Sequence, residues 1–134
     1  MKKFMFVILL GVLFVFSACG NGNKADKDTQ EVIDKVIKKE TKINNASVEV
    51  KEGRQKPYKY TEEDFSFLIY RNKEANRYIM KVYVPFEDTP SDLNYYYSYD
   101  ENKVLNRTNY ESDFQELRSS GNYELVYKSG RFKK

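Results

Sequence analysis

The chain has 134 residues, 32% of them charged and 40% hydrophobic, a length that suits one domain and is too short for two. Its 23 Lys and Arg against 20 Asp and Glu lack the one-sided basic excess of a nucleic-acid-binding protein, so we expect no nucleic-acid partner. The sequence contains no His and a single Cys, Cys19. This composition excludes a Ser-His-Asp triad, a Cys-His pair, an intramolecular disulfide and the usual His/Cys zinc sites. We therefore expect a protein that is not an enzyme and has no catalytic residue, metal or cofactor.

The first residues have the layout of an export signal. Lys2 and Lys3 precede thirteen apolar or Gly residues, 4–16. A membrane-spanning helix needs about 20 apolar residues, so this run is too short to be one. Ordinary signal-peptidase cleavage after Ala18 would also need a small residue two positions earlier, where Phe16 stands.

The run Phe16-Ser17-Ala18-Cys19 resembles the signal motif of bacterial lipoproteins, with Phe16 in place of the usual Leu or Val. The resemblance implies cleavage between Ala18 and Cys19 and lipidation of the Cys19 sulfur. Two or three acyl chains make a lasting anchor, whereas one chain binds only marginally. We therefore predict a signal peptide at 1–18, a lipidated cysteine with a flexible tether at 19–27, and one domain at 28–134. The location implied is the outer face of the cell membrane.

A first helix is predicted at 29–43. Asp28 and Glu31 have the spacing of a capping pair, and apolar residues then recur at helical intervals. They are Val32, Ile33, Val36, Ile37 and Ile43. The other face carries Asp34, Lys35, Lys38, Lys39 and Lys42. That face is either a solvated helix back or a basic surface facing acidic headgroups or wall polymers.

Alternating apolar and polar residues predict strands in the rest of the chain. The segments are 47–51, 65–70, 77–86, 93–99, 104–107 and 123–128. For 104–107, and also for 56–61, the pattern does not decide between a strand and a loop. Turns are expected at 72–76 and 100–103. A short second helix near 113–119, with Ser112 and Gln115 as a capping box, ends at Gly121.

One helix and several antiparallel strands predict an α+β fold, with the N-terminal helix packed on a curved sheet of four to five strands. This order, following the Cys19 signal, resembles the small cystatin-like-fold lipoproteins of Gram-positive bacteria. Some of these are encoded on conjugative elements, where they block redundant DNA transfer by contacting the incoming machinery. The Gln-x-Val-x-Gly segment of protease-inhibiting cystatins is not present, so the resemblance gives no ground for protease inhibition.

Twelve Tyr residues are the most unusual feature, and 95–99 reads Tyr-Tyr-Tyr-Ser-Tyr. Strand alternation puts Tyr95, Tyr97 and Tyr99 on one face and Tyr96 on the other. The rings form either an open platform for a partner or cross-strand pairs that stabilise the sheet.

The functional hypothesis is a non-enzymatic, membrane-anchored interaction module that contacts another envelope or surface protein. Tyr95, Tyr97 and Tyr99, then Tyr83, are its candidate contacts, and exclusion of conjugative elements is a specific version of it. The alternative is a small-ligand or glycan binder with a pocket between helix and sheet. Carboxylates cluster at 62–64, 87–88 and 100–101, and we interpret them as turn and cap residues.

Overall fold

The computed structural model describes residues 24–52, 57–87 and 91–133, with the side chains of 47–52 left out. Its helices are α2 (Lys27–Glu52) and α3 (Glu111–Ser120), with short 3₁₀ helices η1 (Glu62–Asp64) and η2 (Gly130–Lys133). Its strands are β1 (Ser66–Asn72), β2 (Tyr78–Tyr83), β3 (Asn94–Tyr99), β4 (Leu105–Thr108) and β5 (Tyr123–Lys128). The predicted α+β class is confirmed, with one long helix, an antiparallel sheet and a second short helix.

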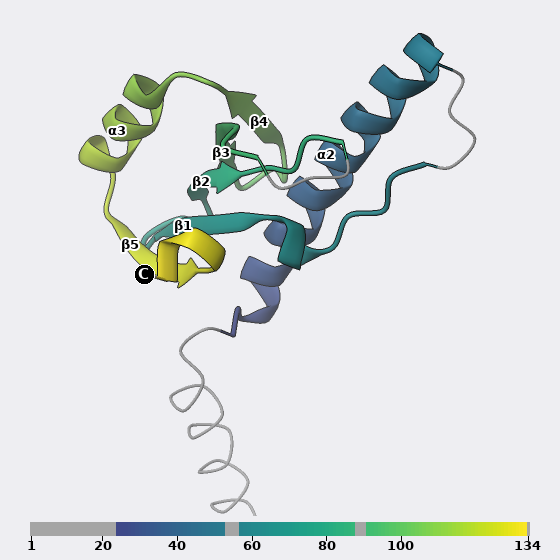
Figure 1. Ribbon diagram of the computed structural model, residues 1–134. Helices are drawn as coiled ribbons and strands as arrows, with labels where there is room; N and C mark the ends of the chain where they lie inside the picture. The colour runs from purple at the N-terminus through teal and green to yellow at the C-terminus, as the bar shows by residue number, and fades with distance from the viewer. Residues whose placement is uncertain (1–23, 53–56, 88–90, 134) are drawn as a thin grey trace, which may run out of the picture.

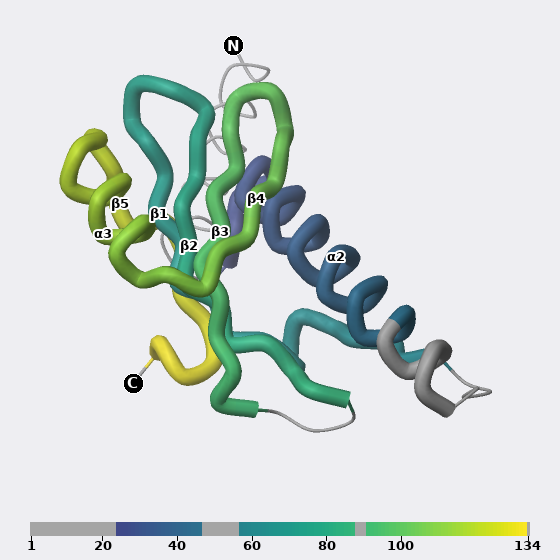
Figure 2. Tube along the Cα trace, turned by 90° about the horizontal axis from the view of Figure 1, so that it is seen from above, coloured from purple at the N-terminus to yellow at the C-terminus, as the bar shows by residue number. Residues whose placement is uncertain are grey.

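The strands form one sheet in the order β4-β3-β2-β1-β5. Each neighbouring pair is antiparallel, and the last strand in sequence, β5, returns to pair with β1. α2 and α3 lie on opposite sides of this sheet (Figure 1, Figure 2). We call the side toward α2 the inner face, which carries Ile69, Met80 and Tyr97, and the side toward α3 the outer face, which carries Ile79 and Tyr96.

α2 begins earlier than predicted. The Asp26 carboxylate accepts the backbone N–H of Thr29 at 2.8 Å, so Asp26 caps the helix and not Asp28. Residues 24–27, expected in the tether, thus include the cap and the first helical residue, and Ala25 packs against the core. The folded domain therefore starts closer to Cys19 than the sequence predicts.

α2 also ends later than predicted, at Glu52, so the expected strand at 47–51 is wrong. The helix continues past the predicted end at 43, through Asn44 and Asn45, and both side chains find partners while the backbone stays helical. The Asn44 amide donates to the Glu40 carbonyl at 2.9 Å. The Asn45 side chain accepts the backbone N–H of Tyr58 at 2.6 Å and donates to its carbonyl at 3.1 Å.

The main core lies between α2 and the inner face. Val32, Ile33 and Val36 of the helix have no exposed surface. The sheet side of the core comprises Phe67, Ile69, Tyr78, Met80, Val82, Tyr97, Tyr99 and Tyr127. Burying one such aliphatic side chain stabilises the fold by about 1.5–3 kcal/mol, so this layer holds α2 on the sheet. A smaller cluster of Ile79, Tyr96 and Phe114 holds α3 on the outer face.

The other predicted elements differ from the structure mainly at their ends. β5 matches its prediction, while β1, β3 and β4 match theirs within two residues at each end. The expected strand at 77–86 is shorter, because Pro85 lacks an N–H and lies beyond the end of β2. Residues 57–61 form no strand. α3 starts at Glu111 after Tyr110 as N-cap, so the Ser112 capping box is wrong, whereas Gly121 does end the helix.

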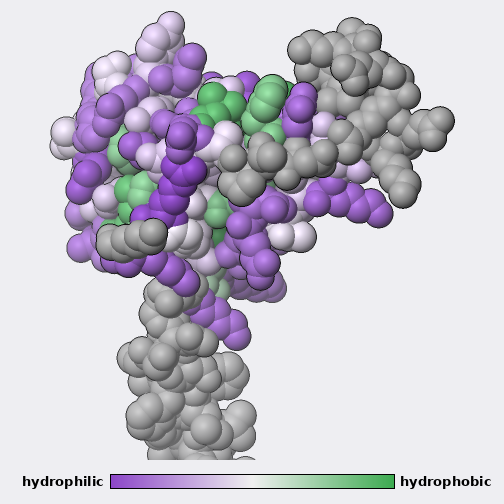
Figure 3. All heavy atoms as spheres, viewed as in Figure 1, coloured by the Kyte–Doolittle hydropathy of each residue, from purple (hydrophilic) through white to green (hydrophobic). Residues whose placement is uncertain are grey.

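The face of the molecule seen in Figure 3 is largely hydrophilic, with small separate hydrophobic areas between the polar side chains. Within the described ranges, no helix combines the length and the apolar character needed to cross a membrane.

Candidate functional site

β3 carries the tyrosine cluster, and most of it is buried. Tyr97 is 2% exposed and Tyr99 4% exposed, both under α2, and Tyr95 is half-buried on the same face. The alternation predicted from the sequence is therefore confirmed, with Tyr96 on the outer face. Of the two interpretations of these rings, the open platform is wrong, because α2 covers the face to which Tyr95, Tyr97 and Tyr99 belong, and the buried rings that stabilise the sheet are what the structure has.

Tyr97 belongs to a polar cluster inside the core. Its hydroxyl donates to Oε1 of Glu40, a carboxylate that is only 2% exposed. Arg107 of β4 donates to the same oxygen at 2.7 Å, and its guanidinium lies 4.0 Å from the centre of the Tyr95 ring. Burial, and then the charge of Glu40, raise the pKa of the Tyr97 phenol far above its usual value. These groups hold β3 and β4 against α2, so their role is structural.

Tyr83, the remaining candidate contact, is half-buried at the end of β2. Its ring lies 5.4 Å from that of Phe132 in η2 and 4.6 Å from the Arg131 guanidinium. The Lys81 ammonium lies 5.8 Å from the same ring. Tyr83 therefore fixes the C-terminal residues on the sheet, and only part of its ring is open to a partner.

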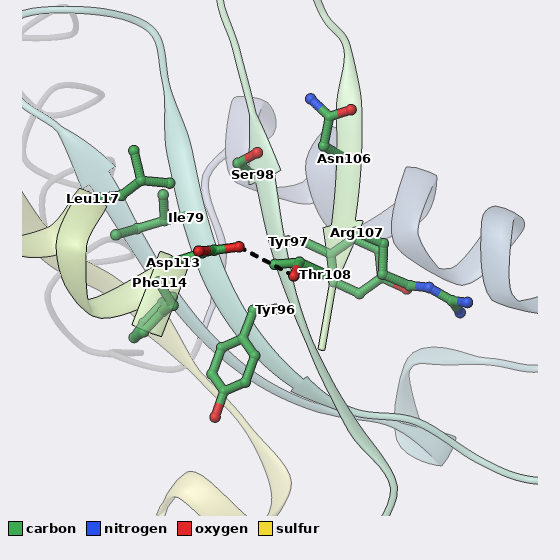
Figure 4. A pocket seen from close by; sticks show the side chains of 10 residues that line it. All are labelled: Ile79, Tyr96, Tyr97, Ser98, Asn106, Arg107, Thr108, Asp113, Phe114 and Leu117. Carbon is green, nitrogen blue, oxygen red and sulfur yellow. Dashed lines mark hydrogen bonds between the residues drawn. The ribbon is translucent and has the colours of Figure 1, made fainter. Parts of the chain in front are cut away.

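A pocket of about 210 Å³ opens on the outer face between α3 and strands β3 and β4 (Figure 4). Ile79 of β2 and Phe114 and Leu117 of α3 form its apolar part. Its remaining lining residues are Tyr96, Tyr97, Ser98, Asn106, Arg107, Thr108 and Asp113. In Figure 4 the Arg107 side chain extends away from Asp113 and Phe114, as expected for a residue that bonds Glu40 on the inner face.

Strand pairing brings the polar groups of this outer pocket together. Ser98 of β3 pairs with Ile79 on one side and with Asn106 on the other, so these three side chains form a row across the outer face. Thr108 pairs with Tyr96, and its hydroxyl donates to the Asp113 carboxylate at 3.4 Å, which ties β4 to α3. The side chains of Ser98 and Asn106 make no hydrogen bond to any described residue.

The outer pocket has the chemistry of a binding site. It combines apolar walls with a few polar groups that can orient a ligand. Asp113 is the one carboxylate among its lining residues, so the pocket holds no pair of carboxylates for acid-base chemistry. Within the part of the chain that is described, no group of three or more potential metal ligands occurs.

Ala18 and Cys19, the predicted cleavage and lipidation residues, lie outside the described residues.

Sequence reasoning missed the outer pocket, although a signal for it was present. Ser98, Asn106 and Thr108 occupy outer-face positions of their strands, where a fully buried sheet would carry apolar side chains. Phe114 and Leu117 have the spacing of one helix face. The sequence does not indicate on which side of the sheet α3 packs.

Comparison with protein-family models, curated proteins and solved structures found no match.

Proposed function

We propose that this chain is a non-enzymatic bacterial lipoprotein, anchored through Cys19 on the outer face of the cell membrane, that binds another envelope or surface protein. The observation that carries the proposal is the outer pocket. It has an apolar wall and two polar side chains, Ser98 and Asn106, that form no hydrogen bond to any described residue. The resemblance to cystatin-like lipoproteins supports the same assignment. In this proposal the outer pocket replaces the buried tyrosines as the contact.

The size of the outer pocket suits one side chain of a partner. Binding energy at protein interfaces concentrates in a few anchor residues that fill pockets, while the surrounding contacts exclude water. Leu117 is 42% exposed at the pocket and Tyr110 is 65% exposed just before α3. These two side chains supply apolar surface beside the pocket, and Ser98 and Asn106 supply hydrogen-bonding groups within it.

Anchoring is tested by feeding cells a labelled fatty acid and isolating the protein. We expect label on the wild-type chain and none on Cys19→Ser, which should also leave the membrane fraction. Ser119→Cys on the exposed side of α3 is the matched control, since it adds a thiol outside the signal motif. Label that persists on Cys19→Ser would contradict the anchor.

Partner binding is tested by placing a photo-crosslinking amino acid at Leu117 in the lipidated protein in its own host. The matched control has the same group at Glu116, which is exposed on α3 but does not line the outer pocket. We expect a discrete protein adduct from position 117 and a much weaker one from 116. Equal adducts from both positions, or none from a folded and membrane-bound protein, would contradict the proposed contact.

The same pocket also supports a second candidate, binding of a small ligand or glycan. The observation that favours it is the unbonded hydroxyl of Ser98 and amide of Asn106 beside the Phe114 ring, since sugars use hydroxyl groups and ring faces together. Titration with mono- and disaccharides, followed by the NMR signals of residues 98 and 106, separates the two candidates. Saturable shifts at these positions that are lost in Asn106→Leu would favour the glycan.

A further inference from the structure

A second pocket lies on the inner side of the sheet, between α2, the end of β2 and the start of β3. We call it the inner pocket, and its volume is about 130 Å³. Ile43, Val84 and Leu93 belong to its apolar wall, and Ile43 and Leu93 are 38% and 41% exposed at its mouth. Glu40 and Arg107 line it as well. The inner pocket therefore connects an apolar mouth with the polar cluster of the core.

The buried Glu40 carboxylate has one oxygen available for a ligand. Its Oε1 accepts the Tyr97 hydroxyl and the Arg107 guanidinium, whereas no described residue donates to Oε2. Among the described residues, the polar side-chain atoms that are fully enclosed without a partner are the hydroxyls of Thr29 and Tyr78, so Oε2 of Glu40 is not enclosed. The inner pocket is the hollow that Glu40 lines, and Oε2 opens into it.

Arg107 likewise has hydrogen-bond donors available. A guanidinium carries several N–H groups. Within the described ranges, Arg107 donates one hydrogen bond, to Glu40 at 2.7 Å, and its side chain is 27% exposed. The guanidinium also lies 4.0 Å from the centre of the Tyr95 ring, which lines the inner pocket and holds the guanidinium in place. The inner pocket thus offers a hydrogen-bond acceptor and hydrogen-bond donors beside each other.

We propose that the inner pocket binds the primary amide of a small aliphatic ligand. An amide has an N–H donor for Oε2 of Glu40 and a carbonyl acceptor for Arg107, and its aliphatic part packs on the apolar wall. The charges of Glu40 and Arg107 offset each other, so a neutral ligand meets no repulsion. A carboxylate would lie against Glu40 and an amidinium against Arg107, and a contact between like charges disfavours both.

The size of the inner pocket limits the ligand. A cavity of about 150 Å³ admits benzene, so a pocket of about 130 Å³ suits an amide with about four carbon atoms. The inner and outer pockets share one lining residue, Arg107, whose side chain extends away from Asp113 and Phe114 of the outer pocket (Figure 4). The inference therefore depends neither on the proposed partner nor on the lipid anchor.

The test compares three ligands of nearly the same shape and different charge, isobutyramide, isobutyrate and isobutyramidinium. Each is titrated into the protein while the NMR methyl signals of Ile43, Val84 and Leu93 are followed. We expect saturable shifts with isobutyramide and an affinity at least about tenfold higher than for either charged ligand. The signals of Ser98 and Asn106 in the outer pocket should stay unchanged.

Variants identify the groups that recognise the amide. Glu40→Gln removes the negative charge at similar volume, so isobutyrate should gain about tenfold relative to isobutyramide, and Arg107→Met should favour isobutyramidinium in the same way. Circular dichroism verifies that both variants are folded. Leu93→Ala shortens the apolar wall and should weaken isobutyramide about fivefold. The matched control, Leu125→Ala, changes a similarly exposed leucine outside the inner pocket and should stay within about twofold of the parent.

Different results would overturn different parts of the inference. Equal affinity for the three ligands would mean that Glu40 and Arg107 take no part in recognition. Tightest binding of isobutyrate would make the inner pocket an anion site, and the absence of saturable shifts in the folded protein would remove the site. An unchanged order of affinities in folded Glu40→Gln would contradict the role of Oε2, and equal effects of Leu93→Ala and Leu125→Ala would place the ligand elsewhere.

Discussion

Removing Arg107 should destabilise the domain by leaving the Glu40 carboxylate buried without its cation. Loss of one partner of a buried ion pair costs about 3–5 kcal/mol. Arg107 is partly exposed and the Tyr97 hydroxyl still donates to Glu40, so for Arg107→Met we expect a cost below that range, about 2–3 kcal/mol. Methionine retains much of the stem, so the change removes charge more than packing.

Urea unfolding followed by far-ultraviolet circular dichroism measures this loss, and it suits a chain without Trp. The decisive comparison is a double-mutant cycle with Glu40→Leu. Arg107→Met should cost much less in the Glu40→Leu background, while the double variant should stay about 1–3 kcal/mol less stable than the parent because the buried Tyr97 hydroxyl loses its acceptor. An equal cost in both backgrounds would refute the reasoning, because Arg107 would then act through packing alone.

Three other predictions test separate features. Burial and the hydrogen bond to Glu62 raise the pKa of Tyr127 from 10 to about 12, so its contribution to stability is present below pH 10 and lost as pH rises through 12. In an ultraviolet titration, Tyr127→Phe should lose a phenol signal that ionises near pH 12 in the parent, and an unchanged curve would contradict this. Gly130 has φ +57° and an added Cβ would lie 2.2 Å from the Ser66 hydroxyl, so Gly130→Ala should lower the free energy of unfolding by about 1–3 kcal/mol. An unchanged urea midpoint would speak against that strain. Finally, if the protein excludes conjugative elements, mating into cells that express it should give fewer transconjugants than mating into cells that do not, and equal transfer would end that version.

The β-sheet was largely predictable because its residues alternate in the way a two-faced sheet requires. Met80 and Val82 face α2 while Ile79 and Lys81 do not, as the pattern in β2 indicates. Tyr97 and Tyr99 follow the same rule in β3. The alternation sorts residues between two faces, but it does not say which face a helix covers.

The end of α2 was not predictable from local pattern. Val48 and Val50 alternate with charged residues as in a strand, and Asn44-Asn45 precedes them as a turn would. The Asn45 side chain instead binds the backbone of Tyr58, thirteen residues away, and this contact satisfies the asparagine without a turn. Such a contact exists only after the chain returns to the helix.

The candidate site moved from one face of the sheet to the other for a related reason. An exposed aromatic platform and a buried aromatic layer have the same sequence pattern, because tyrosine suits both. Ser98 and Asn106 do not indicate a binding site by themselves, since isolated polar residues are common on strands. They become part of a candidate site only because α3 packs Phe114 and Leu117 beside them and leaves the outer pocket open.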